Sequence, residues 1–322
     1  MTSRPSADAP MIEVEGVSRS FGSVTALNDV SMTAPRGTVL GLLGHNGAGK
    51  TTLVNILTTL LPPTSGTARV AGFDVTEKPA QVRARIGLTG QFASVDESLS
   101  GRENLVLIAR LLGASLAQAR SRADELLEVF ELSAAARRPA HTYSGGMRRR
   151  LDLAASIVGH PEVIFLDEPT TGLDPQARSS VQDIVQGLAD DGTTILLTTQ
   201  YLDEADRLAD SITVLSAGSV IASGTSAELK AEVGTLSVRT TFASDADAGR
   251  ASDTLRARGL APADGDEHAT LVVPIEASRH LADVVAAVQD AGVEATGYGL
   301  TEPTLDDVYL ALTAHSADRS AA

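Results

Sequence analysis

Eight consecutive residues, Gly44 to Thr51, constrain the fold of this chain more than any other stretch; they run Gly-His-Asn-Gly-Ala-Gly-Lys-Thr. An apolar run of strand length (38–43) precedes them, and a segment of helical character (52–61) follows. Glycines let such a loop curl until its backbone N–H groups point at a phosphate chain, and the positive end of the next helix adds to that field. The pattern therefore predicts a phosphate-binding loop, in which Lys50 reaches the β- and γ-phosphates and the Thr51 hydroxyl holds Mg²⁺.

A glycine-rich turn without a ligand is the alternative interpretation of this loop. The order of strand, loop and helix favours nucleotide binding over that alternative. The residues expected at the nucleotide are Gly44, His45, Asn46, Gly47, Ala48, Gly49, Lys50, Thr51 and Thr52.

Composition narrows the class of protein. The 322 residues suffice for two or three domains, and a hydrophobic content of 43% allows a buried core. A formal net charge of −15 argues against nucleic acid as a partner, because phosphate backbones attract basic surfaces. The chain has no cysteine, which excludes disulfides and fits the cytosol. No apolar run approaches the roughly 18 residues of a membrane helix, and residues 1–10 do not resemble a signal peptide.

The order of the apolar runs predicts an α/β fold. Strands and helices alternate along most of the chain, which favours a doubly wound core with a mixed sheet flanked by helices. The expected strands are 11–17, 30–34, 38–43, 68–72, 86–89, 163–166, 194–198, 212–215 and 220–222. The expected helices are 52–61, 148–157, 175–188 and 202–208, and a turn is expected within 18–29.

Two regions depart from this alternation. Residues 101–132 carry apolar side chains at helical spacing, so a helical insertion is expected there. From residue 235 a small α+β domain is expected, with strands 236–242, 270–275 and 293–298, helices 246–258, 278–291 and 304–313, and an exposed turn at 264–267. The expected domains are a disordered start (1–10), a core (11–225) with a helical subdomain at about 95–159, and a C-terminal domain (226–322).

Two adjacent carboxylates, Asp167 and Glu168, end the apolar run 163–166. Acids at the end of a buried strand are costly unless a cation lies beside them, and Mg²⁺ is the obvious one. We expect Asp167 to hold Mg²⁺, usually through water, and Glu168 to act as the general base on the attacking water. Two solvated acids at a strand end are the alternative.

A second glycine-rich segment, Ser144-Gly145-Gly146, precedes the expected helix 148–157. Bare backbone N–H groups, a hydroxyl and a helix N-terminus together form an anion site, so we expect phosphate binding here too. A plain glycine-rich helix start is the alternative.

In combination, these segments resemble the nucleotide-binding subunit of an ABC transporter over about residues 11–225. In that family Gly44–Thr51 corresponds to the Walker A motif, Asp167 and Glu168 close Walker B, and Ser144-Gly145-Gly146 is the signature. The resemblance further implies that Gln91 senses Mg²⁺ and the membrane partner, that Asp174 belongs to the D-loop, and that Phe21 stacks on adenine. For Phe21 a core position is the alternative.

One position departs from the family pattern. Where the family usually has a switch histidine, after the strand ending at Thr199, this chain has Gln200. A glutamine can hydrogen-bond a γ-phosphate but cannot carry a charge or a proton. The expected catalytic residues are therefore Glu168, Lys50 and a neutral Gln200, with Thr51, Gln91 and Asp167 at Mg²⁺.

Three segments narrow the resemblance to the ATP-binding subunits of daunorubicin/doxorubicin-type drug exporters: 143–154, 198–205 and 305–313. The resemblance implies a head-to-tail homodimer with ATP between Walker A of one chain and the signature of the other. It also implies a separate transmembrane permease that binds a drug-like cargo, and a peripheral location on the cytoplasmic side of the membrane. Alternatives are export of a lipid, polysaccharide or peptide, a non-transport ABC ATPase, and a regulatory module with an inactive site.

Overall fold

The structure, a computed structural model, describes residues 9–89, 95–233, 236–265, 267–275 and 277–309. It divides into two compact units, Met1–Ser226 and Ala227–Ala322. No helix among the described residues is long and apolar enough to cross a membrane.

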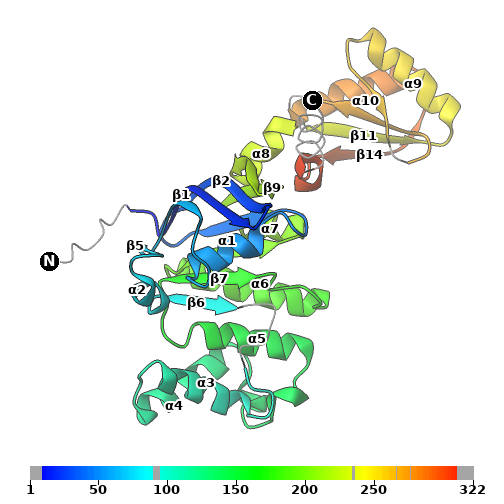
Figure 1. The fold of residues 1–322 in the computed structure, drawn as a ribbon. Coiled ribbons are helices and arrows are strands. Elements are labelled where there is room, and N and C mark those ends of the chain that lie inside the picture. Colours follow the sequence, from blue (N-terminus) through cyan, green and yellow to red (C-terminus); the bar gives the residue numbers. More distant parts are fainter. Residues whose placement is uncertain (1–8, 90–94, 234–235, 266, 276, 310–322) are drawn as a thin grey trace. The chain divides into compact units, whose positions relative to one another are not determined.

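A six-stranded sheet forms the centre of the first unit (Figure 1). Its strands, in spatial order, are β10 (Ser219–Gly224), β9 (Ser211–Ser216), β3 (Val39–Leu43), β8 (Thr194–Thr199), β7 (Val163–Asp167) and β6 (Ile86–Thr89). All neighbours pair in parallel except β10, which is antiparallel to β9. Both faces of this sheet are covered, which explains why β3, β7 and β8 are buried along their whole length.

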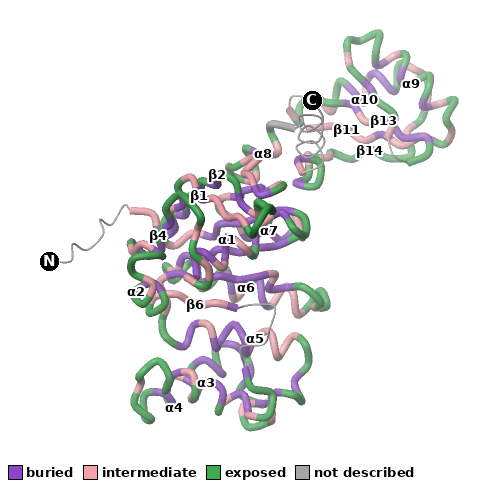
Figure 2. The backbone as a smooth tube through the Cα atoms, in the orientation of Figure 1, coloured by how far each residue is buried: buried purple, intermediate pink, exposed green. Residues whose placement is uncertain are grey.

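Alternate residues of each strand enter two different hydrophobic clusters. Leu40 and Phe165 pack with α1 (Lys50–Leu57) and the antiparallel sheet, whereas Ile164 and Leu166 pack on the other side. That other side is covered by α5 (Gly145–Ser156), α6 (Pro175–Asp190) and α7 (Leu202–Leu208). Buried residues follow the sheet and the inner sides of these helices, while α2 (Pro79–Arg83) is mostly exposed (Figure 2).

A separate four-stranded antiparallel sheet holds the N-terminal strands. Its order is β2 (Val24–Ala34), β1 (Ile12–Phe21), β4 (Ser65–Val70) and β5 (Phe73–Asp74). The turn predicted within 18–29 lies at Gly22 and Ser23, but both strands continue through the rest of this segment and are longer than expected. The β1–β2 register shifts three times, and these irregularities disrupt the alternation that would have revealed the strands.

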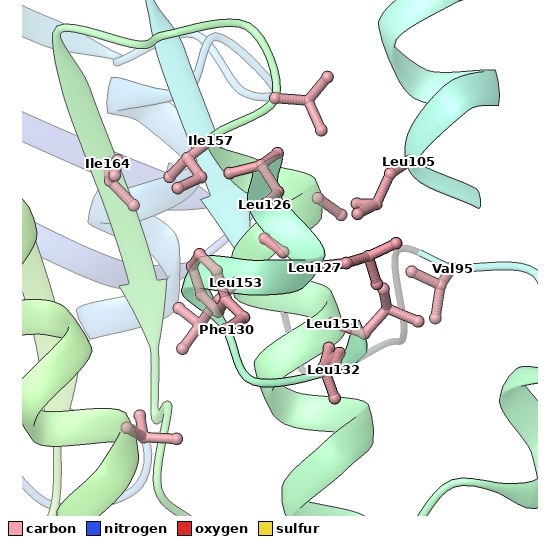
Figure 3. Packing of buried hydrophobic residues seen from close by; sticks show 14 of the residues in the cluster. Val95, Leu105, Leu126, Leu127, Phe130, Leu132, Leu151, Leu153, Ile157 and Ile164 are labelled. Atoms are coloured by element: carbon pink, nitrogen blue, oxygen red, sulfur yellow. The ribbon is translucent and has the colours of Figure 1, made fainter. Parts of the chain in front are cut away.

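The helical insertion consists of two main helices, α3 (Gly101–Leu111) and α4 (Leu116–Val129). Each begins with a capping box, in which Ser100 pairs with Glu103 and Ser115 with Gln118. α5 lies between this insertion and the sheet, contacting α3 and α4 on one side and β6 on the other (Figure 1). Leu105, Leu126, Phe130 and Leu151 share the cluster that joins them (Figure 3).

The second unit follows a β-α-β-β-α-β order with an antiparallel sheet, the split βαβ arrangement. α8 (Ser226–Val233) precedes it. Its elements are β11 (Ser237–Phe242), α9 (Asp245–Ala257), β12 (Ala263–Asp264), β13 (Thr270–Pro274), α10 (Leu281–Asp290) and β14 (Ala295–Thr301), with sheet order β12-β13-β11-β14. The prediction of a turn at 264–267 is wrong for Asp264. This residue belongs to the short strand β12 and pairs with Leu271 of β13.

The last expected helix, 304–313, begins at Leu305 and is described as far as Tyr309. Thr304 caps it: its hydroxyl accepts the Asp307 N–H at 3.2 Å, and the Asp307 carboxylate accepts the Thr304 N–H at 2.8 Å. Leu305 and Val308 are buried. The remainder, 310–313, lies outside the described residues.

Candidate nucleotide site

The phosphate loop, the acidic pair and Gln200 lie at the carboxyl ends of β3, β7 and β8, at one edge of the six-stranded sheet. Leu43 pairs with Thr199, and Asp167 pairs with Thr198. Because the three strands are parallel, the residues after them meet at the same carboxyl edge, where open α/β sheets bind their ligands.

Two glycines of the phosphate loop are required by their surroundings. A Cβ on Gly44 would lie 2.5 Å from the Leu215 carbonyl oxygen. Gly49 has a φ of +108°, and a Cβ there would lie 2.7 Å from the Ala26 carbonyl oxygen. The loop is therefore packed tightly against β9 and β2, which leaves its backbone no room for side chains at these two positions.

Lys50 begins α1 and is 6% exposed. Its ammonium donates to the carbonyl oxygens of Gly44 at 2.6 Å and His45 at 3.3 Å, inside the loop. Burial lowers the pKa of Lys50, and the negative charges of Glu168 and Asp167 oppose that shift. The cation thus lies within electrostatic reach of both acids.

A cavity of 160 Å³ joins the loop to one of the acids. Its lining residues are Ala26, His45, Asn46, Gly47, Gly49, Lys50, Thr51, Thr52 and Glu168. Most of the predicted phosphate-loop residues therefore surround one space with Glu168. The Gly44 carbonyl oxygen accepts a hydrogen bond from Lys50, and the Ala48 side chain is buried.

Asp167 and Glu168 are both held by β8. The Thr198 hydroxyl donates to Asp167 Oδ1 at 2.5 Å, and the Glu168 N–H donates to the Thr198 carbonyl oxygen at 3.0 Å. Glu168 has a φ of +47°, in the left-handed region. The Thr171 hydroxyl donates to its carboxylate at 3.2 Å. Asp167 is buried, whereas Glu168 is half-buried at the cavity.

The residues present fit a Mg²⁺ ion that is completed by nucleotide. No group of three or more His, Cys, Asp or Glu able to hold a metal occurs in the part of the chain that the structure describes. Mg²⁺ commonly takes one or two protein oxygens with substrate phosphates and water. Thr51 lines the cavity, and Asp167 lies next to Glu168 at the same edge.

The signature segment faces a different cavity, of 460 Å³. α5 begins at Gly145 rather than at the expected 148, so both glycines lie in its first turn, and the Ser144 hydroxyl accepts the Met147 N–H at 3.3 Å. Asp174 caps α6 by accepting the Ala177 N–H at 2.8 Å and lines this cavity too. The two cavities share no lining residue, so one chain does not bring Ser144, Gly145, Gly146 and Asp174 to its own phosphate loop.

The remaining predicted residues lie in different places. Phe21 is 45% exposed at the end of β1, so the alternative of a core position is wrong; the Arg19 guanidinium lies 4.7 Å from its ring centroid. Gln200 is exposed and directly follows β8, outside the lining of the phosphate-loop cavity. Gln91 lies outside the described residues.

Sequence reasoning missed three contributors to this site: Thr198, Ala26 and Arg149. Thr198 is a polar residue at the end of the expected apolar strand 194–198, a signal that the sequence alone offered, and the structure shows it buried. Ala26 comes to the loop through the β1–β2 hairpin, and Arg149 donates to the backbone around Glu168 from α5. Neither of these two placements follows from a local pattern.

Comparison with known proteins agrees with the geometry. The family model described as "ABC transporter" matches residues 27–171. A "Daunorubicin resistance ATP-binding protein DrrA3" from Streptomyces coeruleorubidus is 50% identical over 302 residues, covering 94% of this chain and 95% of the relative. The chain belongs to the ABC transporter ATP-binding family.

A further relative in sequence and a similar solved structure support the assignment of this ABC ATPase to its family. A "Daunorubicin/doxorubicin resistance ATP-binding protein DrrA" from Streptomyces peucetius is 48% identical over 308 residues, 95% of this chain and 93% of the relative. A dimeric ATP-binding cassette in a post-hydrolysis state, bound to ADP and Pi, superposes with a TM-score of 0.61 at 25% identity; the match covers 67% of this chain and 98% of the other. The predicted family, fold class and ATPase class are confirmed.

Proposed function

We propose that this ABC ATPase powers export of an anthracycline-like drug or antibiotic through a separate membrane-spanning partner. The observation that carries the proposal is the near-full-length similarity to proteins named for daunorubicin and doxorubicin resistance. Because that similarity extends beyond the ATPase core into the C-terminal domain, it favours a related system over a distant member of the same large family.

At the nucleotide site, Lys50 binds the β- and γ-phosphates of ATP, and Thr51 and Asp167 hold Mg²⁺. The ion, when bound, neutralises charge on the phosphates. Glu168 accepts the proton of the attacking water, supported by its position on the loop cavity. Gln200 hydrogen-bonds the γ-phosphate or that water as a neutral group, since it follows β8 at the same edge.

Two copies of the chain close head to tail around two ATP molecules. The separation of the phosphate-loop cavity from the signature cavity supports this arrangement, because each is then completed by the other copy. The similar cassette with ADP and Pi is itself dimeric. In the closed dimer, Phe21 stacks on adenine, and Ser144, Gly145, Gly146 and Asp174 face the partner's nucleotide.

The remaining assignments concern the parts outside the site. Gln91 relays the state of Mg²⁺ to the permease, which binds the cargo and contacts the helical subdomain at about 95–159. The ATPase domain (11–225) works from the cytoplasmic face of the membrane; the start that was predicted to be disordered (1–10) lies mostly outside the described residues. The C-terminal domain (226–322) acts in assembly and regulation rather than in chemistry.

Drug accumulation in cells that express the chain with its membrane partner tests this function. Cells with both proteins should retain less daunorubicin than cells with the partner alone, and Lys50→Ala should abolish the difference because the phosphate contact is lost. Equal drug retention, with ATPase activity intact, would indicate a different cargo, such as a lipid, polysaccharide or peptide.

A further inference from the structure

Arg149 lies on α5, and its guanidinium contacts the backbone on both sides of Glu168. Its Nε donates to the Pro169 carbonyl oxygen at 2.6 Å, and one terminal nitrogen donates to the Asp167 carbonyl oxygen at 3.1 Å. The two acceptors are the residues immediately before and after Glu168. A single side chain therefore binds the backbone one residue before and one residue after the proposed general base.

The backbone of Glu168 needs such support. Its φ of +47° lies in a region that residues other than glycine rarely adopt, and such backbone conformations persist only where the surrounding structure holds them. The Glu168 N–H bond to the Thr198 carbonyl oxygen, at 3.0 Å, holds it from the β8 side. Arg149 holds the same turn from the α5 side, so the direction of the Glu168 carboxylate depends on both contacts.

The charge of Arg149 is compensated inside the protein. Burial lowers its pKa, and Asp152, Asp167 and Glu204 oppose that shift. Glu204, on α7, is 1% exposed, and neither carboxylate oxygen has a partner in hydrogen-bonding geometry among the described residues, although the hydroxyls of Thr199 and Thr170 lie near. A half-buried cation with a planar fork suits this position, since lysine offers no fixed pair of donors.

We propose that Arg149 is a positioning residue that holds Glu168 in the geometry for water activation and ties it to the signature helix. The inference rests on the proposed role of Glu168. Ser144 caps the same helix five residues earlier. In a head-to-tail dimer, Ser144 and Glu168 of one chain serve different nucleotides, so Arg149 couples the two ATP sites through a single protomer.

Steady-state ATP hydrolysis by Arg149→Lys tests the positioning role. The charge stays but the fork is lost, and the turnover rate should fall about 10- to 100-fold, since misplacing a catalytic group by about 1 Å can cost 10²-fold. The KM for ATP and the binding of a fluorescent ATP analogue should change less than about threefold, because the Asp167 and Pro169 carbonyl oxygens that Arg149 binds flank Glu168 and not the phosphate loop.

A matched control comes from α4. The Arg122 side chain is 16% exposed. It pairs with Glu125 and donates to the Ile157 carbonyl oxygen, just after the end of α5, at 3.0 Å; neither of these described partners flanks Glu168. Arg122→Lys should therefore hydrolyse ATP within about twofold of the parent. A loss in Arg122→Lys as large as that in Arg149→Lys would overturn the inference, because any buried arginine would then produce it.

A double-mutant cycle with Glu168→Gln separates positioning from a general structural effect. If Arg149 acts by holding Glu168, Arg149→Lys should lower the single-turnover rate no further in the Glu168→Gln background, and ATP should still drive that double variant to a dimer on size exclusion. A repeated full loss, or parent-like turnover of the single Arg149→Lys variant, would refute the inference. If Arg149→Lys does not fold, Arg149→Gln, which keeps one donor, replaces it in the same cycle. Parent-like turnover of Glu168→Gln alone would instead show that the proposed base is wrong.

Discussion

The hydrogen bond from Thr198 to Asp167 gives a sharp prediction for stability. Thr198 is fully buried, and its hydroxyl donates to Asp167 Oδ1 at 2.5 Å. Thr198→Val keeps the shape but removes this donor, leaving a buried acid oxygen unpaired. The Glu168 N–H, which also donates to the Thr198 hydroxyl at 3.2 Å, keeps its shorter bond to the Thr198 carbonyl oxygen at 3.0 Å, so the bond to Asp167 is the main interaction lost. A hydrogen bond to a charged group contributes about 1.5–3 kcal/mol, and we expect the free energy of unfolding to fall by that amount.

Thr89→Val is the matched control for this substitution. Thr89 ends β6, is also fully buried, and its hydroxyl has no hydrogen-bond partner among the described residues. Replacing an unsatisfied hydroxyl with a methyl group should leave stability unchanged or raise it by about 1 kcal/mol. Thr198→Ser, which keeps the hydroxyl, should lose less than Thr198→Val.

Urea unfolding of the nucleotide-free chain measures these differences. The chain has no tryptophan, so far-UV circular dichroism follows the transition. The shift of the midpoint multiplied by the slope gives the change in free energy for each variant. The reasoning is refuted if Thr198→Val unfolds like the parent, or if Thr89→Val loses as much stability as Thr198→Val.

Three further predictions address the switch position, the phosphate loop and a buried acid. Gln200→Ala should lose most ATP turnover and Gln200→His should keep it, because both Gln and His can hydrogen-bond the γ-phosphate; an Ala variant with parent-like turnover would contradict the role. Gly47→Ala should cost about 1–2 kcal/mol of stability from its φ of +86°, whereas Gly49→Ala should cost more in the same urea assay, because its new Cβ also meets the Ala26 carbonyl oxygen at 2.7 Å. Burial raises the pKa of Glu204 above its ordinary 4.5, so the folded state holds this proton more tightly than the unfolded state, and stability falls as the pH rises from about 4.5 through the folded pKa. Glu204→Gln cannot ionise, so its melting temperature relative to the parent should rise between pH 5 and pH 8, and a constant difference would contradict the assigned burial effect.

Local patterns predicted the parts of the site that lie within one segment. The phosphate loop depends on glycines, a lysine and a threonine in fixed order between a strand and a helix, and the structure places them around one cavity with Glu168. The pair Asp167 and Glu168 was found because two acids end an apolar strand. In each case the residues that carry the expected chemistry are consecutive in the sequence.

Contacts between distant segments could not be predicted in this way. Arg149 is one of three consecutive arginines, and only the packing of α5 decides which of them reaches the backbone around Glu168. Ala26 is an ordinary small residue until the β1–β2 hairpin brings it to the loop. The two strands of this hairpin were predicted too short because its bulges disrupt the strand alternation. The roles of individual site residues remain predictions.

Turnover and assembly of Glu168→Gln test the central claim, that Glu168 activates water at a composite ATP site, most directly. We predict that this variant binds ATP like the parent, hydrolyses it about 10²-fold or more slowly, and forms an ATP-dependent dimer on size exclusion. Lys50→Ala, measured beside it, should fail to bind ATP and should stay monomeric. Parent-like hydrolysis by Glu168→Gln, or a variant that binds ATP without dimerising, would contradict the account.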